Sequence, residues 1–342
     1  MAQDDEQKDQ IHEPVLLDAV IQWLRPQQGG TFIDCTLGLG GHAEAMLRAS
    51  PDVRVIGIDR DAEAIRLAER RLKIFEGRFH AAHANFTDLL TVMSREGINE
   101  AQGILADLGV SSLQFDRAER GFSFAEDAPL DMRMDRKSGE TAADLVNNLS
   151  ERELADLIFE YGEERGSRPI ARAIVRERSR EPITTTKRLS DIVVRALHVP
   201  GRWRIHPATR TFQALRIAVN DELLALDRFI PDAVSALARG GRLAIISFHS
   251  LEDRVVKRSF LRESGRCICQ LDAKEQAIQK IRAEMAQQTS YDANNADRII
   301  CNRCGARRRV EVLTRKPTRP TEEEVRRNPR SRSALLRVCE KI

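Results

Sequence analysis

Residues 31–43 read Thr-Phe-Ile-Asp-Cys-Thr-Leu-Gly-Leu-Gly-Gly-His-Ala, a short apolar run followed by a glycine-rich turn. The apolar run predicts a buried strand, and the glycines allow a tight turn that aims the first N–H groups of the next helix at a ligand. The spacing Gly38-x-Gly40-x-x-Ala43 also satisfies the dinucleotide fingerprint. Because Asp59 ends a second apolar run about twenty residues later, this stretch predicts a cofactor that contains adenosine. A tight strand-to-helix turn that binds no cofactor is the alternative.

Two cofactors fit this stretch, NAD and S-adenosylmethionine. Asp59 can accept hydrogen bonds from the ribose hydroxyls of either, so it does not separate them. Asp34 lies four residues before Gly38, and its charge would repel the pyrophosphate of NAD but favour the positive sulfonium and amino groups of S-adenosylmethionine. Asp34 therefore favours S-adenosylmethionine, although an Asx residue that only stabilises the turn is the alternative.

Apolar runs alternate with helical patterns along the chain, which predicts an α/β fold with a doubly wound parallel sheet. The expected helices between the first strands are residues 43–49 and 62–75. The expected strands are residues 31–36, 54–59, 79–84, 103–108 and 242–248, followed by a hairpin-like closing pair at 309–313 and 334–339. The pair Gly240-Gly241 is expected to punctuate the start of the strand at 242.

The alternation stops after the fourth strand, where helical patterns continue without a convincing strand. We therefore expect an inserted all-helical domain of residues 113–216 within a discontinuous main domain of residues 1–112 and 217–342. A second, irregular insertion is expected at residues 263–308, with a charged helical stretch at 273–288. The helices expected in the first insertion are residues 141–147, 151–161, 169–178 and 187–197.

Composition and hydropathy exclude several classes of protein. The 342 residues are 42% hydrophobic and 31% charged, which is enough apolar material for one large core or two ordinary ones. The longest apolar stretches fall far short of the ~20 residues that a membrane span needs. The acidic N-terminus lacks the basic start and apolar run of a signal peptide. We therefore expect a cytoplasmic protein with no membrane partner.

Positive charge is concentrated near the C-terminus. The formal net charge of +3 is too small to indicate a polyanionic partner by itself. Residues 298–342, however, hold fourteen Lys or Arg against five Glu. This segment predicts a surface that faces phosphates, and a solvated face paired with Glu322, Glu323 and Glu324 is the alternative.

Asp107 follows Gly103-Ile-Leu-Ala at the expected carboxyl end of the fourth strand, where ligands bind in open α/β sheets. Methyl transfer to an amine needs a free lone pair on nitrogen and an acceptor for an amine proton. Asp107 could accept that proton together with a nearby backbone carbonyl. A structural Asp that caps the following turn is the alternative.

Eight sequence blocks occur in a characteristic order from residue 12 to the C-terminus. They are His12-Glu-Pro-Val-Leu-Leu17, the loop from Asp34 to His42, Asp107-Leu-Gly-Val-Ser-Ser112, Glu119-Arg-Gly-Phe-Ser-Phe124, Pro129-Leu-Asp-Met-Arg-Met-Asp135, His206-Pro-Ala-Thr-Arg-Thr-Phe-Gln-Ala-Leu-Arg216, Ser247-Phe-His-Ser-Leu-Glu-Asp-Arg254 and Asn328-Pro-Arg-Ser-Arg-Ser333. In this order they resemble the bacterial ribosomal RNA small-subunit methyltransferase H family, over nearly the full length of the chain.

The resemblance implies a class I, Rossmann-like methyltransferase sheet with an inserted helical domain. It also implies methyl transfer from S-adenosylmethionine to the exocyclic N4 amine of one cytosine in the decoding centre of 16S ribosomal RNA, within the 30S subunit. It leaves the oligomeric state open, with a homodimer among the alternatives. The cofactor contacts that the motif match implies are Gly40, Gly41, His42, Asp59, Phe86, Asp107 and Gln114, of which Phe86 would pack on the adenine ring.

Two more residues are candidates for catalysis. Asn220 ends a segment that starts at His206 and returns from the insertion to the sheet, and its amide could read a base edge. Arg210 and Arg216 in the same segment could bind phosphates. His249 follows the fifth strand and could orient the substrate or move a proton. For each of them, a structural hydrogen bond, cap or salt bridge is the alternative.

Four cysteines form two short pairs, Cys267-Ile-Cys269 and Cys301-Asn-Arg-Cys304, separated by thirty-one residues. Two such pairs could supply the four thiolates of a structural zinc site. The first pair is unusually tight and the intervening segment is long, so a redox-sensitive or unliganded arrangement stays open. Bound zinc would staple this segment and would not perform methyl transfer.

Two other functions remain as alternatives to the methyltransferase. One is a nicotinamide-dependent dehydrogenase, which the glycine spacing permits. The other is a nucleic-acid-binding module without catalysis, built on the cysteine pairs and the basic C-terminal segment. Substitution of Asp107 by Ala would leave the whole activity of such a module intact.

Overall fold

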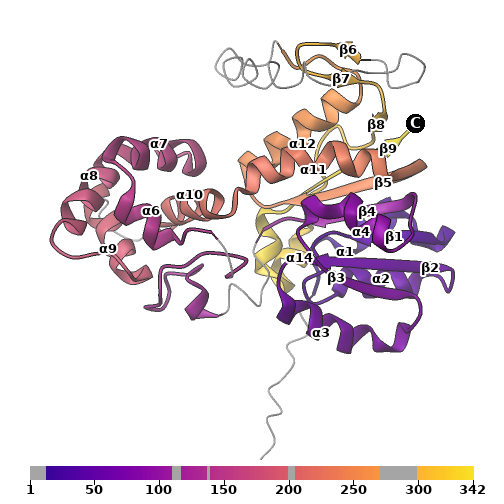
Figure 1. Cartoon of the computed structure of the whole chain (residues 1–342), viewed down its shortest axis with the longest axis horizontal. Coiled ribbons are helices and arrows are strands. Elements are labelled where there is room, and N and C mark those ends of the chain that lie inside the picture. The colour runs from indigo at the N-terminus through magenta and orange to yellow at the C-terminus, as the bar shows by residue number, and fades with distance from the viewer. Residues whose placement is uncertain (1–12, 110–116, 137–138, 199–204, 270–298) are drawn as a thin grey trace, which may run out of the picture. The chain divides into compact units, whose positions relative to one another are not determined.

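The computed structural model describes residues 13–109, 117–136, 139–198, 205–269 and 299–342 (Figure 1). The chain divides into two compact units, one of residues 1–109 and 226–342 and the other of residues 110–225. The domain boundaries expected at residues 113 and 216 stay a prediction. The two units are described separately below.

The first unit contains a seven-stranded sheet. Its strands are β1 (Gly30–Asp34), β2 (Val53–Asp59), β3 (Phe79–His83), β4 (Ala101–Asp107), β5 (Leu237–Ser247), β8 (Val310–Val312) and β9 (Leu335–Lys341). They are hydrogen-bonded in the order β3-β2-β1-β4-β5-β9-β8. Strands β1 to β5 run parallel, β9 pairs antiparallel with β5, and β8 pairs antiparallel with β9. The predicted doubly wound sheet and its closing pair are confirmed.

Helices cover both faces of this sheet, which explains why its strands are apolar throughout. Neighbouring residues of β1 point to opposite faces, so Phe32 and Ile33 belong to different hydrophobic cores. The core around Phe32 is completed by helices α1 (Leu17–Leu24), α2 (Gly41–Ala49) and α3 (Ala62–Leu72). The core around Ile33 is completed by helices α4 (Leu89–Arg95), α11 (Glu222–Ala236) and α12 (Ser250–Glu263).

The start of β5 differs from the prediction. The sequence places it at Arg242, after the glycine pair, whereas the strand begins five residues earlier at Leu237. Gly240 has φ +78° inside the strand, and the register against β4 shifts between Ala101 and Gly103. The glycines therefore allow a bulge within the strand instead of marking its start.

The second unit is helical. Its described helices are α6 (Ala142–Asn148), α7 (Glu151–Gly162), α8 (Ser167–Arg178), α9 (Thr186–Leu197) and α10 (Thr209–Asn220). The first four match the predicted helical stretches, and no β-strand occurs in the described part of residues 110–225. Leu154, Ile158, Ile174 and Val193 are buried in a core of this unit's own. The prediction of an all-helical stretch is confirmed.

The cysteine-containing segment holds a small sheet that the sequence analysis missed. Strands β6 (Ile299–Cys301) and β7 (Ala306–Arg307) form an antiparallel pair of their own. The helical stretch predicted at residues 273–288 lies outside the described residues. The chain then passes through β8 and helix α14 (Glu322–Arg327) to β9.

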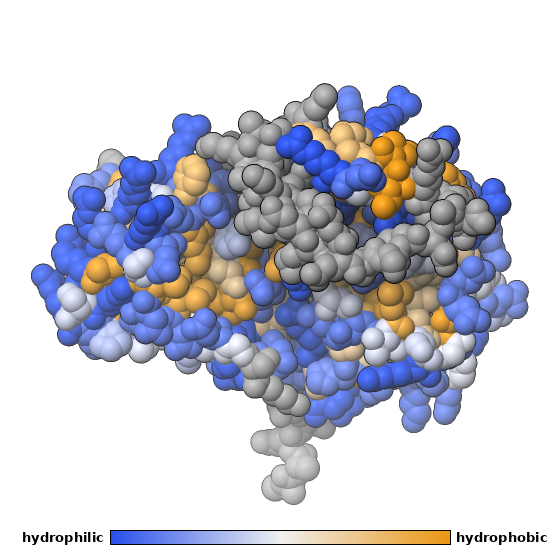
Figure 2. Space-filling model, turned by 45° about the horizontal axis from the view of Figure 1, so that its top comes forward, coloured by the Kyte–Doolittle hydropathy of each residue, from blue (hydrophilic) through white to orange (hydrophobic). Residues whose placement is uncertain are grey.

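None of the helices in the described parts of the chain is long and apolar enough to cross a membrane. Figure 2 shows hydrophilic side chains over most of the face in view, with apolar side chains in smaller groups between them.

Candidate active site

Three carboxylates meet at one edge of the parallel sheet. Asp34, Asp59 and Asp107 are the last residues of β1, β2 and β4. The sequence analysis expects this for Asp59 and Asp107, whereas it extends the first strand two residues past Asp34. The order of the strands reverses between β1 and β4, and ligands of open α/β sheets bind outside the carboxyl ends of strands at such a point. The described strands therefore place all three acids where a cofactor would bind.

Asp59 connects the loop after β1 to the end of β2. Its Oδ2 atom accepts a hydrogen bond from Gly38 N at 2.8 Å, and its Oδ1 atom accepts one from Asp61 N at 2.9 Å. Burial raises the pKa of Asp59, and these two N–H groups oppose that shift. Each carboxylate oxygen has a second lone pair, so Asp59 can still accept hydrogen bonds from ribose hydroxyls.

The glycines of the loop serve the packing of the protein itself. Gly40 has φ +77°, and a Cβ atom there would lie 3.0 Å from Leu72 Cδ1. A Cβ atom at Gly41 would overlap Pro14. Protein atoms therefore fill the space beside both glycines, which explains why the loop needs glycine there. Their contact with the cofactor stays a prediction. Among the described residues, a Cβ atom at Gly38 would meet only Thr36 O, at an ordinary contact distance of 3.9 Å, so this position is less crowded than Gly40 and Gly41.

His42 is buried in the first turn of α2 and connects two segments. Its Nε2 atom lies 3.0 Å from Val15 O and can donate a hydrogen bond to it. Its Nδ1 atom lies 3.9 Å from Asp107 Oδ2. His42 therefore binds the segment before α1 and places its ring next to Asp107.

Asp34 and Asp107 are linked through Thr36, a residue that the sequence analysis missed. Thr36 N donates to Asp34 Oδ1 at 3.2 Å, and Thr36 Oγ1 accepts from Asp107 N at 2.6 Å. Among the described residues, the buried atoms Asp34 Oδ2 and Asp107 Oδ1 have no hydrogen-bond partner. Buried carboxylate oxygens are costly without a partner, which suggests that a ligand satisfies them.

Burial also makes both carboxylates hard to ionise. It raises the pKa of Asp34 to about 7, against the opposing hydrogen bond from Thr36 and with help from the charge of Asp59. Burial, together with the charges of Asp34 and Glu252, raises the pKa of Asp107 well above its ordinary value. A positively charged ligand would offset both shifts, whereas a pyrophosphate would increase them. The acids therefore fit S-adenosylmethionine and do not fit NAD.

Phe86 and Gln114 complete the predicted cofactor contacts. Phe86 follows β3 and begins a short turn of 3-10 helix, Phe86–Asp88. Its partly buried ring packs edge-to-face on Phe229, with the ring centroids 5.2 Å apart. Gln114 lies outside the described residues.

His249 caps helix α12, directly after β5. Its Nδ1 atom accepts a hydrogen bond from Glu252 N at 3.3 Å, while Glu252 Oε2 accepts from the backbone N–H groups of Phe248 and His249 at 2.7 and 3.3 Å. Its Nε2 atom lies 3.2 Å from Glu252 Oε1. Glu252 is only 2% exposed, and the sequence analysis missed it. An acid three residues after the capping residue is the pattern that could have revealed it.

Asn220 belongs to the second unit, whereas Asp107 and His249 belong to the first. Its Oδ1 atom accepts from Met134 N, and its Nδ2 atom donates to Met132 O and to Arg216 O, each at 2.9 Å. Its amide therefore ties a loop to α10, and its role in reading a base stays a prediction.

The two arginines of the same helix differ from each other. Arg216 makes two hydrogen bonds to Glu222, at 2.8 and 2.9 Å. These bonds form a structural salt bridge, which is the alternative to phosphate binding. Arg210 is 55% exposed and lies 3.7 Å from Glu164. Arg210 is therefore the better candidate for phosphate binding.

The basic C-terminal segment contains both structural and exposed cations. The side chain of Arg337 is 7% exposed and donates to both oxygens of Asp253, at 2.6 and 3.0 Å. Arg309 pairs with buried Glu263 at 2.6 Å. Arg303 and Arg308 are exposed. Only part of the segment can therefore face phosphates.

Comparisons with known proteins identify what the chain resembles. A family model described as the MraW methylase family matches residues 9–342. A protein of Geobacter sp. (strain M21), named Ribosomal RNA small subunit methyltransferase H, is 48% identical over 334 residues, which cover 97% of this chain and 98% of that protein. A protein of the same name from Carboxydothermus hydrogenoformans is 44% identical over 97% of this chain and 98% of its own length.

Among solved structures, an rRNA methylase from Streptococcus thermophilus is 10% identical and covers 95% of this chain and 93% of its own, with a TM-score of 0.34. This score is too low to bear on the fold.

Proposed function

Since the chain belongs to the MraW methylase family, we propose that it methylates RNA of the small ribosomal subunit, with S-adenosylmethionine as the methyl donor. The reaction transfers the methyl group to the N4 amine of a cytosine in 16S ribosomal RNA. The observation that carries this proposal is the match to the family over residues 9–342. The carboxylates at the edge of the sheet supply a physical account of how the chain performs the reaction.

The first part of that account is cofactor binding. S-adenosylmethionine supplies a methyl group on a positively charged sulfur. The carboxylate of Asp34 balances positive charge on the ligand, and binding in turn favours the ionised form of Asp34. Asp59 holds the ribose, Phe86 packs on the adenine, and Gly38 leaves room beside the loop. Gly40, Gly41 and His42 contact the cofactor through a loop whose shape depends on their packing against Leu72, Pro14 and Val15.

The second part is proton transfer at Asp107. The exocyclic amine of cytosine is a weak nucleophile because its lone pair is delocalised into the ring. A hydrogen bond from the amine to the Asp107 carboxylate draws electron density back to the nitrogen, and this carboxylate then accepts a proton. Burial raises the pKa of Asp107, which makes its ionised carboxylate a stronger base. The ring of His42 lies beside this carboxylate, with 3.9 Å between Nδ1 and Oδ2.

The remaining predicted residues have supporting roles. His249 orients the substrate from the end of β5, and its ring is positioned by Glu252. Asn220 reads a base edge or shapes the loop at Met132. The exposed arginines contact phosphates, which makes RNA binding weaker at higher salt.

The site and setting of the target follow from the same proposal. The target is one cytosine of the decoding centre, presented by the 30S subunit in the cytoplasm. That base must leave its stack to reach the donor, which is easiest for a base that is not paired. A homodimer stays a prediction.

The proposal is tested by labelling. The purified protein is incubated with methyl-labelled S-adenosylmethionine and undermethylated 30S subunits, and the digested RNA is analysed by mass spectrometry. We expect label in N4-methylcytidine and its loss in Asp107→Ala. Asp191→Ala, at an exposed position of α9, is the matched control and should keep full activity.

Three results would change the conclusion. Label in another nucleoside, or no label despite measurable cofactor binding, would mean that the substrate is wrong. Full methylation by Asp107→Ala would remove Asp107 from the mechanism. Binding of RNA without any methylation would instead favour the nucleic-acid-binding module.

A further inference from the structure

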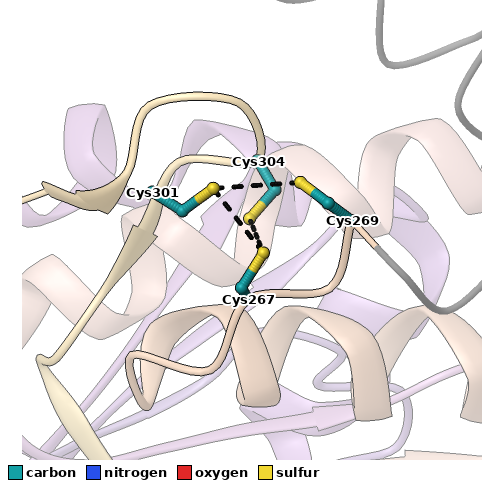
Figure 3. Close-up of side chains that lie close together, drawn as sticks. All are labelled: Cys267, Cys269, Cys301 and Cys304. Carbon is teal, nitrogen blue, oxygen red and sulfur yellow. Dashed lines mark hydrogen bonds between the residues drawn. The ribbon is translucent and has the colours of Figure 1, made fainter.

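The four cysteines of the two pairs lie together, although twenty-nine residues between them are not described. Cys267 and Cys269 follow α12, Cys301 ends β6, and Cys304 precedes β7 (Figure 3). The Sγ atom of Cys301 lies 3.6 Å from that of Cys267 and 3.8 Å from that of Cys269, and the Sγ atoms of Cys267 and Cys304 are 3.9 Å apart. All four sulfur atoms lie within 4.8 Å of one another.

We propose that Cys267, Cys269, Cys301 and Cys304 bind one structural Zn²⁺ ion. In a tetrahedral site with Zn–S bonds of about 2.3 Å, neighbouring sulfur atoms are ~3.8 Å apart. The three measured distances agree with that value. Metal and site lie outside the methyl-transfer chemistry, so the proposal goes beyond the proposed function.

Other arrangements of four thiols have different geometries. A disulfide needs its two sulfur atoms at about 2.05 Å, far below every distance in this cluster. In an iron–sulfur cluster, at least two of the cysteines bind different iron atoms, which keeps their sulfur atoms farther apart. A single tetrahedral ion is the ligand that brings all four sulfur atoms this close.

Backbone N–H groups point at two of the sulfur atoms. Those of Cys304 and Arg303 donate to Cys301. Those of Ile268 and Ala306 donate to Cys304. Hydrogen bonds of this kind stabilise and orient thiolates that ligate a metal.

The turn between Cys301 and Cys304 has a geometry that suits metal binding. Gly305 has φ +70°, a conformation that favours glycine, and its N–H donates to Cys301 O at 2.8 Å. The hairpin β6–β7 therefore presents both of its sulfur atoms on the same side.

Contacts that do not involve sulfur hold the two pairs near each other. Arg309 makes an ion pair with buried Glu263 at the end of α12, and Arg309 N donates to Glu263 O at 2.8 Å. An isolated β-bridge joins Ser264 to Arg308. The site is therefore partly organised before any metal binds, which lowers the entropy that binding must overcome.

The charges next to the cysteines also fit. Four thiolates and one Zn²⁺ ion carry a net charge of two negative units. Arg266, Arg303, Arg307 and Arg308 lie beside the cysteines in the sequence and partly offset this charge.

The consequence of metal binding is mechanical. Helix α12 begins after the His249 cap, beside the candidate active site, and ends at Glu263. Three residues separate Glu263 from Cys267. A metal ion that joins Cys267 and Cys269 to the hairpin fixes that end of the helix. We therefore expect loss of the metal to destabilise the protein more than it changes the chemical step.

The test is metal analysis of the full-length protein. The chain is purified without chelators, and zinc and iron are measured by inductively coupled plasma mass spectrometry. We expect about one zinc per chain in the parent protein and close to none in Cys301→Ala and Cys304→Ala. Cys339→Ala is the matched control, since Cys339 is buried in the core of β9 away from the cluster, and it should keep its zinc.

A second measurement uses the parent protein alone, so that the proposal can be tested even where the cysteine variants do not fold. The parent protein is loaded with Co²⁺, whose tetrahedral thiolate complexes absorb strongly in the visible range, and we expect this spectrum. Absence of metal with four titratable thiols, iron in place of zinc, or unchanged zinc in Cys301→Ala would overturn the proposal. None of these readouts depends on methylation, so failure here is distinct from failure of the proposed function.

Discussion

Asp34 shows how a single buried carboxylate connects stability with ligand binding. It is 1% exposed, and one of its oxygens has no hydrogen-bond partner among the described residues. A group in such a place destabilises the folded protein when it is ionised. Asp34 is explained by function, because its carboxylate can balance the positive charge of a cofactor.

The first prediction at this scale concerns stability against pH. The pKa of Asp34 is about 7 in the folded protein, above its value of roughly 4 in an unfolded chain. Its contribution to stability is therefore complete below pH ~4 and is lost as the pH rises through 7. Without ligand at pH 8, Asp34→Asn should be more stable than the parent by roughly 2–4 kcal/mol.

Thermal or urea unfolding of the ligand-free proteins between pH 4 and pH 8 tests this expectation. The advantage of Asp34→Asn should shrink as the pH falls. Asp52→Asn, at an exposed position, is the control and should show no such trend. An advantage that is the same at every pH would contradict a titrating Asp34.

At the scale of elements, α12 connects the catalytic edge of the sheet with the cysteine cluster. Its first turn holds Glu252, whose carboxylate satisfies the backbone N–H groups of Phe248 and His249. The charge of Glu252 also raises the pKa of Asp107. The helix therefore influences the proton acceptor without contacting the substrate.

The prediction at this scale is a shift in the pH dependence of methylation. Glu252→Gln keeps a side-chain oxygen as an acceptor but removes the charge, so the pKa of Asp107 should fall. The acidic limb of the profile of kcat/KM against pH should move to lower pH. Glu160→Gln, on the exposed face of α7, should leave the profile unchanged. A loss of activity at all pH values, with no shift of the limb, would indicate a structural role alone.

At the scale of the whole molecule, the last part of the chain holds the first part in place. Glu324 in α14 accepts a hydrogen bond from Leu16 N at 2.6 Å, and Asn328 Nδ2 donates to Glu13 O at 2.9 Å. The carbonyl of Val15, between these two contacts, lies against His42. The motif at residues 328–333 therefore acts on the active site through the segment before α1.

This arrangement predicts that Asn328→Ala weakens cofactor binding several-fold, because the segment that supports His42 becomes looser. Asn328→Asp should have the same effect, since it keeps the acceptor for Arg330 N and loses the donor to Glu13 O. Calorimetric titration with S-adenosylmethionine measures the change. Asn99→Ala, at an exposed loop position, is the control. If Asn328→Asp bound S-adenosylmethionine as tightly as the parent protein, the contact between Asn328 and Glu13 would have no effect on the cofactor site.

The sequence by itself determined the features that depend on neighbouring residues. Apolar periodicity placed the strands of the sheet and the helices of the second unit, and it put Asp59 and Asp107 at strand ends. These patterns are readable because a strand or helix places its side chains at fixed intervals. Ordered blocks such as Asp34 to His42 also pointed to the family before any contact was known.

Only the tertiary structure decided which distant residues meet. It brought Thr36 to Asp107 and Glu324 to Leu16. It also corrected one interpretation, since the glycines of β5 form a bulge, and it showed that Gly40 and Gly41 are needed for internal packing. Such contacts join residues tens to hundreds of positions apart, and they form because the whole chain closes around its cores, so no local pattern encodes them.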